Sequence, residues 1–201
     1  MYIVCMDMEG IITPEIWIEF SEAVGIPELA LTTRDEPDYD KLMKHRMDLL
    51  NANGYGLKEI QEVISKMDPL PGARAFLDDL RSFAQVVILS DTFTQFAMPL
   101  MEKLGWPTLF CNKLTVDNEG KISGYVMRTQ GSTKLSAVKA LQSTGFKTIA
   151  VGDSFNDLAM IRASQAGFLF RSTEAIKKDN PDIPAVETYE DLMKGIKTIL
   201  G

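Results

Sequence analysis

Short apolar runs alternate with longer stretches of helical periodicity along most of the chain. The predicted strands have the length of buried strands and cover residues 2–7, 86–89, 108–116, 122–127, 147–151 and 167–170. The predicted helices cover residues 73–83, 133–144 and 188–199. Two more are predicted, one that ends at residue 104 and one that begins near residue 156. Because strands that alternate with helices are typical of α/β proteins, we predict a doubly wound, Rossmann-like parallel sheet.

Residues 14–70 carry three helical patterns in succession and no strand pattern. The first follows Pro14 and stops at Gly25, and the second begins after Asp38, a residue suited to capping a helix N-terminus. The third covers about residues 57–67. We therefore predict a small helical cap inserted after the first strand, with the boundaries 1–13 and 71–201 for the α/β core and 14–70 for the cap.

The composition is that of an ordinary globular protein of 201 residues, with 45% hydrophobic and 24% charged residues. The net charge of −7 argues against nucleic acid or an anionic membrane as the main partner. Cys5 and Cys111 lie in apolar runs, so we expect two small buried hydrophobic side chains and no disulfide framework. The chain shows neither a signal-peptide pattern nor an apolar run near 18 residues, which predicts a cytoplasmic protein. Assembly into a homodimer is left open by the sequence.

Acidic residues follow two of the predicted strands. Asp7 and Glu9 come after the first strand, and Asp153 and Asp157 come after the strand that ends at Val151. In an open parallel sheet, ligands bind just beyond the carboxyl ends of the strands. Carboxylates gathered there can hold Mg²⁺, and one of them could attack a phosphoryl group. Taken alone, Asp7 is better explained as a loop acid that caps the next element.

Two further polar residues fit a phosphate site, although each also has an ordinary interpretation. Ser90 follows an apolar run and precedes a predicted helix, whose N-terminal amides suit phosphate oxygens; a plain helix cap explains it as well. Lys134 lies in the first turn of a predicted helix, where a cation opposes the helix dipole. A phosphate or carboxylate beside Lys134 would offset that effect, whereas a solvated surface lysine needs no such partner.

The order of these segments resembles the haloacid dehalogenase superfamily of phosphotransferases over nearly the whole chain. The most specific match is the segment Gly152-Asp153-Ser154-Phe155-Asn156-Asp157. Within the superfamily the chain is similar to the phosphoserine phosphatases, on the strength of Glu15 at the start of the predicted cap and Arg46 in its second helix.

This resemblance implies a Mg²⁺-dependent phosphatase that acts on L-phosphoserine through an aspartyl-phosphate. The implied catalytic groups are Asp7 as nucleophile and Glu9 as general acid and then base. The implied metal ligands are the Asp7 side chain, the Glu9 backbone carbonyl and the Asp153 side chain, supported by Asp157. The implied substrate contacts are Ser90 and Lys134 to the phosphoryl oxygens, Glu15 to the ammonium group and Arg46 to the carboxylate, with Asp91 and Asn156 beside them.

The chain departs from the usual phosphatase pattern at two positions. Glu9 stands where the family usually has Asp, and Asp91 stands where it usually has a small residue. Both departures resemble the bacterial phosphoserine phosphatase/homoserine phosphotransferase group, which implies phosphoryl transfer to homoserine as a second activity. Two other functions remain open: a phosphatase for another small phosphate, which would not need Glu15 and Arg46, and a phospho-accepting signalling domain, in which the lysine would follow the last strand.

Overall fold

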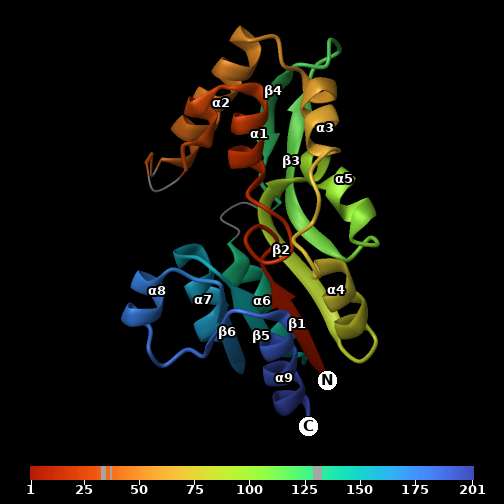
Figure 1. The fold of residues 1–201 in the computed structure, drawn as a ribbon, viewed down its shortest axis with the longest axis vertical. Coiled ribbons are helices and arrows are strands. Elements are labelled where there is room, and N and C mark those ends of the chain that lie inside the picture. Colours follow the sequence, from red (N-terminus) through yellow and green to blue (C-terminus); the bar gives the residue numbers. More distant parts are fainter. Residues whose placement is uncertain (33–34, 37, 129–132) are drawn as a thin grey trace.

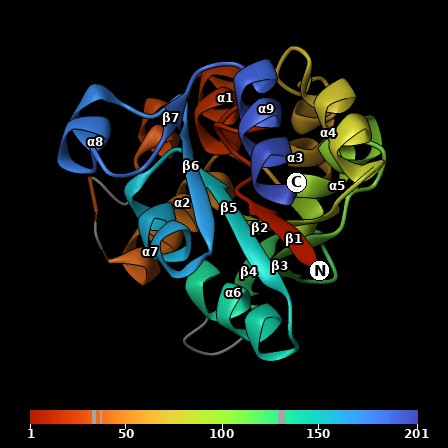
Figure 2. The same cartoon turned by 90° about the horizontal axis from the view of Figure 1, so that it is seen from below.

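The computed structural model describes residues 1–32, 35–36, 38–128 and 133–201, and a seven-stranded sheet forms the centre of this part of the chain. The strand order is β4-β3-β2-β1-β5-β6-β7; Figure 1 labels the first six strands of the chain, and Figure 2 shows β7 beside β6. Five neighbouring pairs are parallel, and β3–β4 is an antiparallel hairpin, so the predicted α/β fold with a mostly parallel sheet is confirmed. The strands are β1 (Tyr2–Met6), β2 (Gln85–Phe93), β3 (Leu109–Val116), β4 (Ile122–Val126), β5 (Lys147–Gly152), β6 (Ala166–Phe170) and β7 (Ala185–Val186).

β1 lies in the middle of the sheet and is the point where the strand order reverses. It pairs with β2 on one side, where Cys5 faces Val87, and with β5 on the other, where Met6 faces Val151. The chain builds one half of the sheet outward from β1 and then returns to build the other half from β5. A crevice opens at such a reversal, just outside the carboxyl ends of the strands, and is the usual ligand site of this architecture.

Two layers of helices cover the sheet, and the alternation along β1 shows why both are needed. Val4 and Met6 point into one apolar cluster, whereas Ile3 and Cys5 point into the other. Figure 2 shows α4 and α9 on one side of the sheet and α6 and α7 on the other. The first layer is α4 (Ala73–Arg81), α5 (Thr94–Lys103) and α9 (Tyr189–Leu200), and the second is α6 (Lys134–Ser143), α7 (Phe155–Ala163) and α8 (Glu174–Asp179).

The described residues between 14 and 70 form helices, as the sequence predicts. Asp38 caps α2 and accepts hydrogen bonds from the amides of Asp40 and Lys41, and Gly25 ends α1 with a left-handed φ of 69°. One short 3-10 helix was not predicted. The helices are α1 (Ile16–Val24), η1 (Pro27–Ala30), α2 (Tyr39–Ala52) and α3 (Leu57–Ile64).

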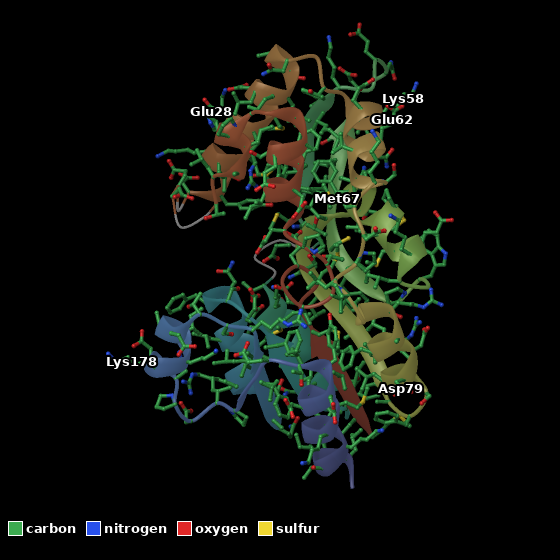
Figure 3. All side chains as sticks on the ribbon, in the orientation of Figure 1. Glu28, Lys58, Glu62, Met67, Asp79 and Lys178 are labelled. Atoms are coloured by element: carbon green, nitrogen blue, oxygen red, sulfur yellow. The ribbon has the colours of Figure 1, made fainter. Side chains whose placement is uncertain are left out.

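These helices lie at one end of the molecule beside the β3–β4 hairpin (Figure 1). Phe20 of α1 and Ile64 of α3 belong to the same buried apolar cluster as Leu114 of β3. Lys58 and Glu62 of α3 lie at the outer surface of this end (Figure 3). The helical segment and the sheet therefore share one continuous apolar core, and the division into cap and core stays a prediction.

The two cysteines differ in exposure. Cys5 is buried in β1, as predicted, whereas Cys111 of β3 is partly exposed, so the prediction of a buried side chain is wrong for Cys111. Burial raises the pKa of the Cys5 thiol to about 12, so this side chain stays neutral. Among the helices of the described residues, none has the length and apolar character needed to cross a membrane.

Candidate active site

A cavity of about 160 Å³ lies at the carboxyl ends of β1, β2 and β5, where the strand order reverses. It gathers side chains from the sheet, from α1 and α2, and from the N-terminal ends of α6 and α7. Nearly all of the residues singled out in the sequence line it: Asp7, Glu9, Glu15, Arg46, Ser90, Asp91, Lys134, Asp153 and Asn156. The remaining residue, Asp157, is fully buried and accepts hydrogen bonds from two of these residues, Lys134 and Asp153.

Asp7 is held rigidly at the end of β1. Its amide donates to the carbonyl of Val151 in β5 (3.0 Å), and its Oδ1 accepts from the amide of Met8 (2.7 Å). The side chain is 10% exposed. Burial raises the pKa of Asp7, while Lys134 beside it acts in the opposite direction. The carboxylate is therefore both fixed in orientation and largely withdrawn from water.

Lys134 bridges two of the acidic residues. Its Nζ lies 2.7 Å from Asp7 Oδ2 and 2.7 Å from Asp157 Oδ1. Burial alone would lower the pKa of Lys134, but the charges of Asp7 and Asp157 outweigh it and raise that pKa. This resolves the question that the sequence leaves open, since Lys134 is a buried, paired cation and not a solvated surface lysine.

Asp157 combines a structural and an electrostatic role. Its Oδ2 accepts from the amides of Asp153 (3.0 Å) and Ser154 (3.1 Å), which closes the first turn of α7 as a capping box. Its Oδ1 is bonded to Lys134. Because both oxygens already accept hydrogen bonds, Asp157 is better suited to orient its neighbours than to coordinate a cation directly.

The acidic cluster fits a divalent cation. Asp7, Asp153 and Asp157 each offer an oxygen within 4.8 Å of the others, and Lys134 balances only one of these charges. Burial, and then Asp157, raise the pKa of Asp153 to about 7, which shows how strongly the cluster resists a further negative charge. A Cβ on Gly10 would lie 2.7 Å from Asp153 Oδ2, so the loop approaches this carboxylate closely only because the residue is glycine. Hard cations such as Mg²⁺ prefer carboxylate oxygens of this kind.

Glu9 and Glu15 lie beside each other on the other side of the cavity. Glu9 Oε2 accepts from the amide of Ile16 (3.4 Å) at the start of α1. Burial and then the carboxylate of Glu15 raise the pKa of Glu9 well above its usual range. A carboxyl group with a raised pKa keeps its proton to a higher pH, which favours the role of a general acid.

Arg46 reaches the cavity from α2 and is fixed by its packing. Its guanidinium lies 4.3 Å from the ring centroid of Trp17, and one terminal nitrogen donates to the carbonyl of Leu31 (2.6 Å). Burial lowers the pKa of Arg46 to about 10. Its Nε is buried and has no hydrogen-bond partner among the described residues. The side chain therefore keeps a positive charge and a donor for an anionic group in the cavity.

Ser90 lines the cavity but does not stand at a helix N-terminus, so that part of the prediction is wrong. β2 continues through Phe93, and its register against β3 shifts between Leu89 and Phe93, so α5 begins only at Thr94. Ser90 lies in this irregular stretch, where its Oγ accepts from the amide of Thr92 (3.2 Å). The backbone irregularity, and not a helix dipole, aims the hydroxyl at the cavity.

Two residues that support Ser90 and Asp91 were missed in the sequence. Arg128 donates to the carbonyl of Ser90 (2.6 Å) and lies 3.4 Å from the carboxylate of Asp91. Asn112 of β3 donates to the carbonyl of Asp91 (2.9 Å) and accepts from the amide of Arg128. Asn112 lies inside a predicted strand and Arg128 comes just after one, and neither belongs to a chemical motif, so no local signal marks them. Trp17 and Tyr39 also line the cavity and were not singled out.

The chain matches the family model "haloacid dehalogenase-like hydrolase" over residues 5–165. It is 50% identical to phosphoserine phosphatase ThrH of Pseudomonas aeruginosa, over 96% of this chain and 94% of that protein. It is 47% identical to a phosphoserine phosphatase of Pseudomonas syringae pv. tomato, over 96% and 81% respectively. A solved apo phosphoserine phosphatase has a similar fold, with a TM-score of 0.74 at 22% identity over 96% of this chain and 97% of that one. The chain therefore belongs to the haloacid dehalogenase-like hydrolases.

Proposed function

We propose that this protein hydrolyses L-phosphoserine to L-serine and phosphate through an aspartyl-phosphate on Asp7. The observation that carries the proposal is the division of one cavity into two ends. The acidic cluster with Lys134 forms one end, and Arg46 with Glu15 forms the other. The first end suits a phosphoryl group, and the second suits a group with one carboxylate and one ammonium. The names of the two Pseudomonas relatives support the same substrate.

In the proposed first step, a carboxylate oxygen of Asp7 attacks phosphorus and the bond to the serine oxygen breaks. Glu9 donates its proton to that oxygen as serine leaves, which the raised pKa of Glu9 favours. In the second step Glu9 takes a proton from water, the water oxygen bonds to phosphorus, and the acyl-phosphate bond to Asp7 breaks. Ser90 and Lys134 hold the phosphoryl oxygens through both steps.

We propose Mg²⁺ as the cofactor, held by the Asp7 side chain, the Glu9 backbone carbonyl and the Asp153 side chain. Its charge would offset the negative charge of the phosphoryl group in this acidic cluster. Asp157 would keep Asp153 and Lys134 in place through the hydrogen bonds described above.

At the other end of the cavity, Arg46 would bind the substrate carboxylate and Glu15 the ammonium group. The buried, positively charged Arg46 offers the Nε donor that lacks a partner among the described residues. Hydrogen bonds between a guanidinium and a carboxylate are roughly twice as strong as neutral ones. Asp91, restrained by Arg128, and Asn156 would complete the wall around the substrate.

Transfer of the phosphoryl group to L-homoserine is the proposed second activity, in which the homoserine hydroxyl replaces water in the second step. It rests on Glu9 and Asp91, which follow the pattern of the homoserine phosphotransferase group. We further propose a cytoplasmic enzyme with residues 14–70 as a cap on the core formed by 1–13 and 71–201, either monomeric or homodimeric.

The decisive experiment is incubation of the protein with phosphoserine and Mg²⁺, with and without homoserine, followed by identification of serine, phosphate and phosphohomoserine. Absence of serine release would contradict the proposal. Repeated turnover would exclude a phospho-accepting signalling domain, which is modified only once per molecule.

Arg46→Ala tests the alternative of another small phosphate substrate. If Arg46 binds the carboxylate of phosphoserine, the KM of Arg46→Ala for phosphoserine should be about tenfold or more above that of the wild type, because a charge-assisted hydrogen bond contributes about 1.5–3 kcal/mol. The melting temperature of the variant must be measured alongside, because Arg46 also packs on Trp17. An unchanged KM in a folded variant would favour a substrate without a carboxylate.

A further inference from the structure

The chain crosses twice between the sheet and the helices α1–α3, and Tyr189 lies against both crossings. The first crossing is the loop 8–13 after β1, and the second precedes α4. The amide of Leu70 in the second crossing donates to the carbonyl of Ile12 (3.0 Å), which ties the crossings together. The hydroxyl of Tyr189 donates to the neighbouring carbonyl of Ile11 (2.6 Å), although the two residues are 178 positions apart.

The ring of Tyr189 is fixed by its surroundings. It stacks between Phe76 of α4, with ring centroids 4.7 Å apart, and Phe170 of β6, with centroids 5.1 Å apart. The guanidinium of Arg171 lies 5.1 Å from the same ring. Gly72, at the start of α4, lies beside the ring, and a Cβ there would be in ordinary contact with it at 3.5 Å. Tyr189, the first residue of α9, therefore holds its hydroxyl in a fixed position.

The loop that this hydroxyl holds is closed on itself. The amides of Ile12 and Thr13 donate to the carbonyl of Met8 (2.9 and 3.1 Å), and the amide of Gly10 donates to the carbonyl of Thr13 (2.8 Å). A loop bonded in this way moves as a unit. Burial raises the pKa of Tyr189 to about 12, so its hydroxyl keeps the proton that it donates at neutral pH.

We propose that Tyr189 is a positioning residue for Glu9, because its bond to Ile11 fixes the loop that carries Glu9 relative to Asp7 and the sheet. The inference rests on the proposed function, in which Glu9 protonates the leaving oxygen. Ile11 and Ile12 are fully buried and the bond itself is partly buried, so loss of the hydroxyl takes from the Ile11 carbonyl a fixed protein donor. A misplacement of about 1 Å at a reacting group can reduce turnover by about 10²-fold.

Tyr189→Phe tests this role because it removes the hydroxyl and keeps the stacked ring. At a Mg²⁺ concentration that saturates each protein, we compare kcat/KM for phosphoserine, whose alkoxide leaving group needs a proton, with kcat/KM for p-nitrophenyl phosphate, whose leaving group departs as a stable anion. The value for phosphoserine should fall about tenfold, a part of the roughly 10²–10⁴-fold that general acid catalysis contributes, while the value for p-nitrophenyl phosphate stays within about twofold. An equal fall for both substrates, or no fall for either, would overturn the proposal, because a simple loss of folded protein lowers both together.

Hydrogen exchange gives a readout that does not depend on the substrate. In metal-free protein, peptides covering residues 8–13 should exchange faster in Tyr189→Phe than in the wild type. Tyr2→Phe is the matched control, because it removes a hydroxyl at the opposite end of β1. Unchanged exchange in Tyr189→Phe, or the same increase in Tyr2→Phe, would overturn the positioning role. If the wild type leaves phosphoserine intact, the proposed function fails, and the leaving-group comparison is then made with glycerol 3-phosphate.

Discussion

At the scale of single residues, the site stores unfavourable electrostatic free energy in its acidic cluster. Asp153 shows this most clearly, since burial and Asp157 raise its pKa to about 7, well above the usual value of an aspartate. Between about pH 4 and pH 7, the folded metal-free protein therefore keeps a proton on Asp153, whereas the unfolded chain has lost it. Stability then falls as the pH rises through this window.

Asp153→Asn should remove this pH-dependent loss. In the presence of a chelator at pH 8, the variant should be more stable than the wild type by on the order of 2 kcal/mol, and the difference should shrink towards zero near pH 4. Urea unfolding at several pH values measures both quantities. A difference that is the same at pH 4 and pH 8 would contradict the electrostatic explanation.

The same pair of proteins tests the metal. Mg²⁺ should raise the unfolding free energy of the wild type, by about 2.7 kcal/mol when its concentration is a hundred times the dissociation constant. Asp153→Asn removes a proposed ligand, so the gain should be largely lost. Equal gains in both proteins would show that Mg²⁺ binds elsewhere.

Glu9 is the residue where a single methylene should affect the choice of acceptor. Its carboxyl reaches the amide of Ile16 and lies beside Glu15, which we propose binds the ammonium of the incoming homoserine. Glu9→Asp shortens this reach, so the carboxylate should accept a proton from water more readily than from the hydroxyl of homoserine. The ratio of phosphohomoserine to phosphate should fall severalfold in a product assay with both acceptors present. An unchanged ratio would reject this explanation.

The sequence predicted these acids because each follows a strand, and the carboxyl ends of parallel strands meet at one edge. It could not predict Arg128 or Tyr189, because their roles depend on contacts with Ser90 and Ile11 across 38 and 178 positions of the chain. A pattern within a short window contains no information about such contacts.

At the scale of secondary structure elements, the irregular end of β2 is the feature that shapes the site. After Phe93 the chain turns into α5, and the described pairing with β3 ends at Asn112. Gln95 continues the pairing with its side chain, which donates to the carbonyl of Leu114 (2.8 Å) and accepts from its amide (2.9 Å). A side-chain amide thus takes the place of the next strand residue.

Gln95→Met should therefore destabilise the protein although it keeps the volume of the side chain. The backbone of Leu114, which is 2% exposed, would lose two hydrogen bonds, at a cost of about 2 kcal/mol. Gln61→Met is the matched control, because it loses one bond, to the carbonyl of Gln95, and should cost about half as much. Urea midpoints with unchanged m-values measure both, and equal costs would contradict this role of Gln95.

The regular elements were predictable from local periodicity, and the short ones were not. The starts of α1 and α2 carry Pro14 and Asp38, which are marks of helix N-termini that can be seen without a structure. α8 and β7 span six and two residues, which is too short for a periodic pattern to emerge. The irregular end of β2 was also missed, because its bend follows from pairing with β3 and not from its own residues.

At the scale of the whole molecule, the helical segment and the sheet are joined by more than a shared apolar core. The amide of Leu57 donates to the carbonyl of Gly120 (2.8 Å) at the turn of the β3–β4 hairpin. Lys103 of α5 donates to the carbonyl of Met67, which lies at the junction between the two parts (Figure 3). Trp17 of α1 packs edge-on against Phe96 of α5, with ring centroids 5.2 Å apart.

These contacts predict one cooperative unfolding transition for the helical segment and the sheet together. Trp106 is 60% exposed, so Trp106→Phe should cost little stability and leave Trp17 as the single tryptophan, located where the two parts meet. Urea unfolding followed by the fluorescence of Trp17 should coincide with unfolding followed by far-UV circular dichroism, the usual test of a two-state transition. If the helices α1–α3 were an independent lid, the fluorescence would change at lower urea than the circular dichroism. Coincident curves would instead show that the packing between Trp17 and Phe96 is lost in the same transition that unfolds the sheet.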